Sequence, residues 1–351
     1  MKLFLFLKSF LNMRRVIKLI RFIKREHRLP TYIEILSHLK IKRKIMPLPV
    51  FIQLEPTTRC NLNCVMCTRS KMNPSRLNQD LSLEKFKHIL REIPTVKKIK
   101  LQGMGEPLLT RDLWKITQYG ILKKKKFTTI INGTLVNKEN VDLILKNFVE
   151  VTISLDTANP ENYLQIRRMN FFNKVVENLK LLVQRKKELK LNTRIFINSV
   201  ISHLNYREID ALIELAKDCG VNGIGFVEVE NWKTPLEKDY EEEKNFVQQA
   251  RQFSREIQRK ILLKKGIESL EIGFLSSEKR KLKCRWPFDS CFITVDGFVT
   301  PCCIRMDPEV FNFGNIFETP FKEIWNSKKY QEFRETMIKN LPNPICDNCP
   351  D

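Results

Sequence analysis

The sequence is poor in histidine and contains no long uncharged apolar run. Only four histidines occur among 351 residues, and none lies in the cysteine-rich loop at 55–68. This scarcity disfavours zinc sites that combine Cys and His ligands. No uncharged stretch approaches the roughly 20 apolar residues that a membrane-crossing helix needs. The apolar start, Met1 to Phe10, is interrupted by charge and precedes no small-residue cleavage site, so no cleaved secretion signal is expected.

Acidic residues are too few to balance the basic ones. The net charge is +22, and residues 1–50 alone hold thirteen Lys or Arg against two acids, Glu26 and Glu34. A basic balance indicates anionic partners such as nucleic acid, a membrane surface or an acidic peptide. Outside residues 1–50, solvated lysine faces explain the excess equally well. The length and the 42% apolar content predict a globular chain large enough for two domains.

Residues 1–26 alternate apolar and basic side chains with helical spacing. This pattern is typical of a basic amphipathic helix that lies on an anionic membrane. A helix that packs beneath a catalytic domain or meets a protein partner fits the pattern as well. We assign residues 1–49 to this N-terminal extension, with its prolines after residue 29 marking a connector.

Six short apolar segments alternate with helical patterns between residues 50 and 230, which predicts a parallel sheet built from βαβ units. Helices are expected at 82–93, at 160–190 and at a segment closed by Gly220. Six units are too few for an eightfold barrel, so the prediction is a partial (β/α)6 barrel of the TIM type. Residues 231–281 are densely charged and predict a helical linker without chemistry. The expected strands are 50–55, 97–102, 127–132, 149–156, 194–202 and 223–230.

Three cysteines, Cys60, Cys64 and Cys67, follow the first predicted strand in a CxxxCxxC spacing. Thiolates on so short a loop can converge on three corners of an iron–sulfur cube. A fully protein-ligated 4Fe–4S cluster takes four cysteines, so three would leave one iron open to a small molecule. Structural zinc and unliganded thiols are the alternative interpretations.

A second motif, QGMGEPLL at 102–109, follows the second predicted strand. Together the two motifs resemble the radical S-adenosylmethionine (radical SAM) superfamily, in which SAM occupies the open iron. The resemblance covers about 180 residues, and it departs from the usual pattern at Met66, where an aromatic residue is common, and at Met104, where glycine is common. Methionine is apolar and adaptable enough to replace an aromatic side chain near adenine.

The resemblance implies a set of SAM contacts at the carboxyl ends of the strands, where barrel enzymes place their chemistry. The glycines let backbone approach a ligand, and Glu106 can pair with an ammonium group. Ser154 would contact the SAM carboxylate or ribose. Arg167 would pair with the same carboxylate, and Arg168 is the alternative for that role. Val227–Glu230 is a weaker candidate for the adenine side. The implied SAM-binding residues are Gly103, Gly105, Glu106, Pro107, Asn132, Ser154 and Arg167.

The tail, residues 282–351, holds six further cysteines around a predicted Asp-Gly hairpin. It resembles the SPASM domain, a small cysteine-rich domain that binds auxiliary 4Fe–4S clusters. One cluster needs four of the six cysteines, and zinc on the same four is the alternative. Cys303 competes with Cys302, since adjacent strand residues point oppositely, and Cys291 is expected to be a buried thiol. The implied ligands are Cys284, Cys302, Cys346 and Cys349.

The resemblance implies an enzyme that cleaves SAM reductively, generates a 5′-deoxyadenosyl radical and abstracts hydrogen from a substrate. The auxiliary cluster would accept an electron from the substrate radical or bind the substrate. The substrate would be a peptide or protein, or a small molecule of cofactor, lipid or envelope-sugar biosynthesis. The absence of a recognisable precursor-binding domain in residues 1–50 weakens the peptide interpretation.

Partners and location follow from the same interpretation. Thiolate ligands for iron indicate a reducing compartment, so a cytoplasmic enzyme is expected, with peripheral contact to the inner membrane through residues 1–26. A ferredoxin or flavodoxin would supply electrons. No RNA-binding module is recognisable, so nucleic acid is not an expected partner. The non-enzymatic alternative, an electron carrier or zinc-stabilised binding module, has no need of the GMGEP motif or of a barrel.

Overall fold

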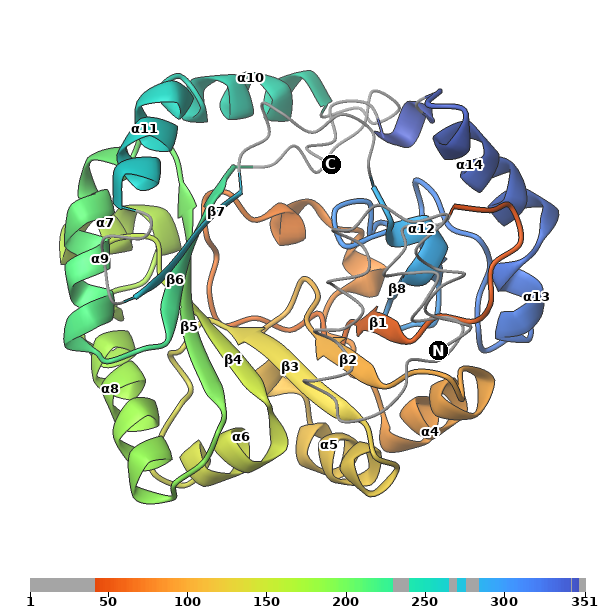
Figure 1. The fold of residues 1–351 in the computed structure, drawn as a ribbon, viewed down its shortest axis with the longest axis horizontal. Coiled ribbons are helices and arrows are strands. Elements are labelled where there is room, and N and C mark those ends of the chain that lie inside the picture. Colours follow the sequence, from red (N-terminus) through yellow and green to blue (C-terminus); the bar gives the residue numbers. More distant parts are fainter. Residues whose placement is uncertain (1–41, 230–239, 265–269, 276–283, 342, 347–351) are drawn as a thin grey trace, which may run out of the picture.

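The computed structural model describes residues 42–229, 240–264, 270–275, 284–341 and 343–346. The predicted helix at 1–26 and the predicted ligand Cys349 lie outside this part of the chain. Within it, nine strands form one sheet in the order β7-β6-β5-β4-β3-β2-β1-β8-β9. The strands curve around an interior in a wide arc, with helices on the outer side (Figure 1). This arrangement is the partial barrel that the sequence predicts.

Strands β1 to β8 run parallel to one another, and β9 is antiparallel to its partner, β8. The parallel order follows the chain from β1 to β7, as expected for right-handed βαβ units. The bounds are β1 Phe51–Leu54, β2 Lys98–Leu101, β3 Lys126–Ile131, β4 Glu150–Ser154, β5 Arg194–Ile201, β6 Gly223–Glu228, β7 Glu271–Leu275, β8 Phe292–Ile293 and β9 Val299–Thr300.

Two of the helices that follow strands, α4 and α7, begin at a polar side chain that accepts a hydrogen bond from one of the first backbone N–H groups. Ser82 caps α4, accepting from the Lys85 backbone at 3.2 Å, as the sequence predicts. Gly220 lies beyond the end of α9 with φ +71°, also as predicted. The helix bounds are α4 Leu83–Glu92, α5 Leu113–Leu122, α6 Val141–Asn147, α7 Pro160–Arg167, α8 Phe172–Glu188, α9 Ile209–Asp218, α10 Tyr240–Ala250, α11 Ser254–Lys264, α12 Trp286–Asp289, α13 Phe321–Trp325 and α14 Lys328–Ile338.

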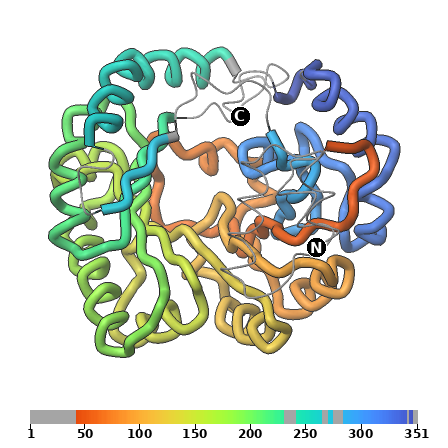
Figure 2. The backbone as a smooth tube through the Cα atoms, in the orientation of Figure 1, coloured from red at the N-terminus to blue at the C-terminus, as the bar shows by residue number. Residues whose placement is uncertain are grey.

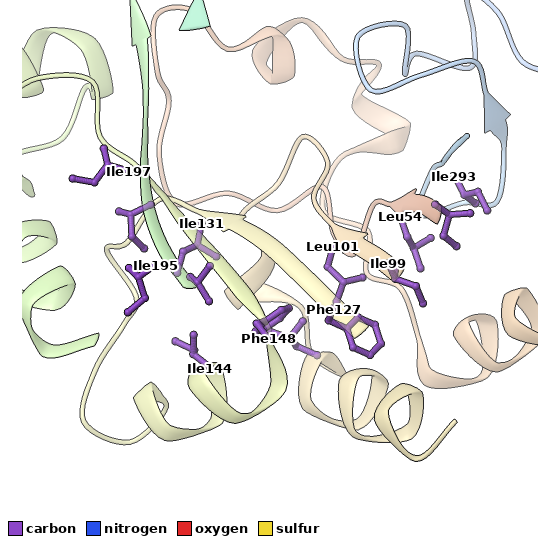
Figure 3. Close-up of a cluster of buried hydrophobic side chains, with 14 of the residues drawn as sticks. Leu54, Ile99, Leu101, Phe127, Ile131, Ile144, Phe148, Ile195, Ile197 and Ile293 are labelled. Carbon is purple, nitrogen blue, oxygen red and sulfur yellow. The ribbon is translucent and has the colours of Figure 1, made fainter. Parts of the chain in front are cut away.

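The main core lies between the outer face of the sheet and the helices. Alternate strand residues such as Ile99, Phe127 and Ile195 are fully buried there, and Figure 3 shows several of them against α5 and α6. Because strand side chains alternate between faces, the residues between them face the interior of the barrel. That inner face is polar, as Gln53 and Thr128 illustrate.

Two details differ from the sequence prediction. Residues 271–275 form β7, which extends the sheet beside β6, although the segment 231–281 was expected to be helical throughout. Its alternation, with Ile272 buried, is a strand pattern that the surrounding charge obscures. The helix expected at 160–190 is two helices, because Arg168 ends α7 in the left-handed conformation with φ +61°.

The tail packs against the segment that precedes β1. Trp325 donates to the Pro47 carbonyl at 2.9 Å, and the fully buried Arg334 stacks on the Trp325 and Tyr330 rings. Arg334 also donates to the carbonyls of Pro287 and Lys44, at 2.6 and 2.9 Å. Figure 2 shows this part of the tail, in blue, beside the red start of the described chain. Among the described helices, none has the length and apolar character to cross a membrane.

Candidate active site at the carboxyl edge of the sheet

The three cysteines of the first motif occupy a loop directly after β1. All three side chains are partly buried, and burial, helped by Glu106, Cys64 and Cys67, raises the pKa of Cys60 to about 11. Burial and the neighbouring Cys64 also raise the pKa of Cys67. The surroundings of this loop therefore disfavour the anions of Cys60 and Cys67. Such a set becomes favourable as thiolates only beside a metal cation.

The donor set suits a cluster with one open iron. Three cysteines lie on one short loop, and Arg167 donates to the Cys64 sulfur at 3.5 Å. Each thiolate of a 4Fe–4S cube binds a different iron atom, so three cysteines leave the fourth iron open. Within the described ranges, no three His, Cys, Asp or Glu side chains are grouped as ligands of a single metal ion. By its chemistry, the donor set fits a three-cysteine cluster.

The second motif is bound to the cysteine loop through backbone hydrogen bonds. The Gly105 N–H donates to the Thr57 carbonyl at 3.2 Å, and the Glu106 N–H donates to the Arg59 carbonyl at 2.7 Å. A Cβ on Gly105 would lie 2.4 Å from the Thr57 oxygen, and one on Gly103 would lie 2.3 Å from Glu55. Both glycines are thus needed for contact with the protein's own chain, a reason that the sequence pattern does not reveal.

Glu106 connects the second motif to the third strand. Its side chain is 2% exposed, and its two oxygens accept from the Asn132 and Leu108 backbone N–H groups at 2.7 and 3.1 Å. Burial raises its pKa to about 7, while these N–H groups and Arg167 oppose the rise. Pro107 follows as the first residue of a short 3₁₀ turn. The carboxyl group is held rigidly at the edge of the sheet.

Asn132 lies at the end of β3 and reaches back to the cysteine loop. Its side-chain amide donates to Asn61 at 2.9 Å, and Asn61 donates to the Thr134 hydroxyl at 2.8 Å. Gly133 occupies the left-handed region with φ +78°, as expected of an Asn-Gly turn. Asn61 and Thr134 are not among the predicted site residues, and only their positions beside the sequence motifs could have indicated them.

Arg167 reaches the cysteine loop from α7. Its guanidinium lies 2.5 Å from the Asp156 carboxylate and donates to the Cys64 sulfur at 3.5 Å. Asp156 and Arg167 are 1% and 8% exposed, whereas Arg168 is exposed. Asp156 also accepts from the Val200 backbone at 2.8 Å. Ser154, the last residue of β4, is partly buried at the same edge. The arrangement places a cation beside a prospective cluster ligand.

A buried carboxylate that the sequence analysis did not single out joins the core to the tail. Glu55, 1% exposed at the end of β1, accepts from the Met104 and Val295 backbone N–H groups at 3.0 and 3.2 Å. Arg76 lies 3.9 Å from Glu55 and 3.1 Å from Asp296 in the tail hairpin. A charged residue at the end of a buried strand is the signal that could have found Glu55.

The tail cysteines have distinct surroundings. Cys302 is buried, and its sulfur accepts from the Arg305 backbone at 3.4 Å; Cys303, half-buried, raises the pKa of Lys100 on β2. The two adjacent thiols therefore lie in different surroundings, Cys302 beside the tail backbone and Cys303 on the side of the barrel lysine. Cys291 is fully buried, and burial raises its pKa strongly. Cys284 and Cys346 are partly buried.

A cleft that is partly open to solvent lies between the core and the tail, next to these motifs. Its core wall comes from residues 68–76 and from Glu55 and Met104, and its tail wall from 304–311 and Ile345. Methionine and phenylalanine side chains line it together with Arg76 and Asp307. A mainly apolar cavity with a few charged groups is typical of a small-molecule site.

Comparison with known proteins agrees with this geometry. Residues 54–216 match the model of the radical SAM superfamily, and residues 284–350 match that of an iron–sulfur cluster-binding domain, SPASM. The chain therefore belongs to the radical SAM superfamily, and it carries a C-terminal SPASM domain. It is a radical SAM enzyme, as the sequence motifs predict.

Similar proteins differ in what they act on. An AdoMet-dependent heme synthase of Methanosarcina barkeri is 28% identical over 311 residues, which are 82% of this chain and 85% of that protein. A GTP 3′,8-cyclase of Synechocystis is 28% identical over 285 residues, 76% and 82% of the two chains. Streptococcus suis SuiB, solved with a precursor peptide, superposes with a TM-score of 0.60 at 17% identity, covering 87% of this chain and 72% of SuiB. That last likeness shows the fold alone.

Proposed function

We propose that this radical SAM enzyme binds two 4Fe–4S clusters and acts on a small molecule held between its core and its tail. The observation that carries the proposal is that the loop with Cys60, Cys64 and Cys67 is tied to the second motif, through the Glu106 N–H and the Arg59 carbonyl, and to Arg167, which donates to the Cys64 sulfur. When bound there, SAM and the reduced cluster supply a 5′-deoxyadenosyl radical for hydrogen abstraction.

The proposed SAM contacts lie around this edge. Glu106 and the backbone of Gly103 to Pro107 would receive the amino group, since the buried carboxylate is already oriented by two N–H donors. Arg167 is a cation for the carboxylate of SAM, and Asn132 and Ser154 complete the edge on β3 and β4. The chain's own task here is to orient these groups and exclude water.

We propose that the tail binds one auxiliary 4Fe–4S cluster through Cys284, Cys302, Cys346 and Cys349. Cys302 is favoured over Cys303 because its sulfur points into the tail, beside Arg305, whereas Cys303 acts on the barrel lysine Lys100. The burial of Cys291 away from solvent suits a thiol without a metal. The domains would span 50–230 and 282–351, with 231–281 between them.

The substrate class rests on the cleft and on the relatives. The cleft is lined mainly by apolar side chains with a few charged groups, as small-molecule sites usually are. The heme synthase and the GTP cyclase both match over most of their lengths. A peptide substrate, which the fold of SuiB can accommodate, is the outcome that would replace this proposal. A reductant of the ferredoxin or flavodoxin type, usually acidic, suits a chain of charge +22. Contact of residues 1–26 with the inner membrane surface would bring the enzyme to a membrane-linked substrate.

The test is SAM cleavage by anaerobically reconstituted protein with dithionite, measured as 5′-deoxyadenosine by mass spectrometry. The wild type is expected to form it slowly without substrate. Cys64→Ala should abolish formation, whereas Cys219→Ala, which removes a buried thiol at the end of α9, should not. Wild-type protein that binds iron but forms no 5′-deoxyadenosine would refute the assignment and favour an electron carrier.

A further inference from the structure

The inner face of β2 carries a lysine that lacks a counter-charge. Ile99 and Leu101 are fully buried on the outer face, so Lys98 and Lys100 face the interior of the barrel. Lys98 is exposed, but Lys100 is partly buried. Across the described part of the chain, no hydrogen bond and no ion pair holds the Lys100 ammonium group. A cation in that position needs a partner, because burying an unpaired charge is costly.

The neighbours of Lys100 offer neutral polar groups. In the register of the sheet, Lys100 stands between Gln53 on β1 and Thr128 on β3, which are 1% and 4% exposed. Gln102, two residues further along the same face, has a buried side-chain oxygen that accepts no hydrogen bond. Within the described ranges, the inner face of β2 therefore presents a partly buried cation, Lys100, and a buried acceptor, the Gln102 oxygen, without hydrogen-bond partners.

The nearby carboxylates do not satisfy the lysine. Glu150, on the inner face of β4, lies 3.9 Å from Arg194, and the same guanidinium lies 2.7 Å from Glu271. Burial lowers the pKa of Lys100, while Cys303 and Glu150 oppose that change from a distance and Lys98 adds to it. Arg194 thus engages both carboxylates, and positive charge remains at β2.

The inner face of the strands across the arc from β2 carries two positions without side chains. Gly225 on β6 and Gly273 on β7 are register partners on that face. A Cβ added at either would come no closer than 3.5 Å to another heavy atom. Figure 1 shows β6 and β7 on the side of the arc away from β2.

We propose that Lys100 binds an oxyanion, a carboxylate or a phosphate, carried by the substrate. The Gln102 oxygen then accepts a hydrogen bond from an N–H or O–H group of the same molecule. The inference rests on the proposed function, and it narrows the substrate to anionic small molecules that extend from the carboxyl edge into the barrel.

The experiment follows hydrogen transfer from substrate to SAM. Reconstituted enzyme, SAM and dithionite are incubated with a small-molecule extract of cells that make this protein, grown in D₂O. Deuterium in 5′-deoxyadenosine then reports abstraction from a true substrate. The extract is first separated on an anion-exchange resin at pH 7. We expect the transferring activity in the retained fraction; phosphatase treatment abolishes it for a phosphate and leaves it for a carboxylate.

Variants tie the effect to Lys100. Lys100→Met should lower deuterium transfer at limiting substrate by about tenfold to a hundredfold, the size expected for a lost bond to a charged group. Lys100→Arg keeps the cation and should lose less. Lys138→Met removes the same charge from an exposed position after β3 and should behave as wild type. Iron content and substrate-free SAM cleavage show that each variant is folded.

Three outcomes overturn the inference. The first is deuterium transfer that occurs only with the unretained fraction. The second is a retained fraction that gives no deuterium transfer. The third is Lys100→Met enzyme that transfers deuterium as well as Lys138→Met does. If Lys100→Met fails to incorporate iron, the Lys100→Arg variant is used instead. Deuterium transfer by Lys100→Arg at the wild-type level, from the retained fraction, then supports a requirement for a cation at this position. Failure of the proposed function is distinguishable, since no 5′-deoxyadenosine would then form even without extract.

Discussion

Asp156→Asn should destabilise the protein more than its single altered atom indicates. The side chains of Asp156 and Arg167 are 1% and 10% exposed, and their charged groups lie 2.5 Å apart. At an effective dielectric constant of 20, that separation corresponds to roughly 7 kcal/mol of gross attraction, most of it offset by desolvation. Asparagine keeps an oxygen for the Val200 N–H but leaves the guanidinium buried beside Cys64 alone. Breaking such a pair from one side costs about 3–5 kcal/mol.

Anaerobic urea unfolding of reconstituted protein, followed by circular dichroism, measures this cost. Asp156→Asn combined with Arg167→Met should be less destabilised than Asp156→Asn alone, because no charge then remains unpaired. Asp142→Asn, which breaks the exposed ion pair with Arg185, is the matched control and should shift the midpoint far less. A shift for Asp156→Asn no larger than that of the control, or no recovery in the double variant, would refute the argument.

Three further predictions concern the frame of the site. Glu106→Gln should change the pH dependence of stability. Because the folded protein raises the pKa of Glu106 to about 7, the wild type should lose on the order of 3 kcal/mol relative to the variant as pH rises from about 4.5 through 7. The same difference in unfolding free energy between the two proteins at pH 5 and at pH 8 would contradict this. Gly105→Ala should displace the cysteine loop, because its Cβ would meet backbone oxygens at 2.4 and 2.5 Å, and the iron bound by the core should fall. Gly225→Ala, whose Cβ would come no closer than 3.5 Å to another heavy atom, should keep the iron. Arg334→Met removes the donors to the buried Pro287 carbonyl and the partly buried Lys44 carbonyl, so it should lower the unfolding free energy by roughly 2–4 kcal/mol. Hydrogen exchange should locate the loss mainly in the tail, and the same protection pattern in both proteins would contradict the prediction.

The sequence predicted the fold well where local pattern and packing agree. The first six strands occur where apolar segments follow helical ones, and Ser82 and Gly220 bound helices as their chemistry requires. The strand β7 was missed because charge dominates its surroundings, although Ile272 is buried. The break between α7 and α8 at Arg168 depends on a left-handed backbone conformation, and no glycine at that position indicates it in the sequence.

The site shows the same division. Short-range motifs marked the three core cysteines and Glu106, because their spacing is fixed by a single loop. The contacts that hold the motifs together involve residues far apart in the chain, such as Glu55 with Val295 and Asn132 with Asn61. Lys100 is one lysine among many in the sequence, and only the register of the sheet places it inside the barrel.

The central claim is that this chain holds two independent 4Fe–4S clusters on defined cysteines. The most direct measurement is iron and sulfide per chain in anaerobically reconstituted protein. We expect about eight irons in the wild type, about four in the Cys60/Cys64/Cys67→Ala variant, and about four in Cys302→Ala. Cys303→Ala, its neighbour in the chain, should keep about eight. About four irons in the wild type with no change in Cys302→Ala would contradict the auxiliary cluster, and negligible iron with bound zinc would contradict the account as a whole.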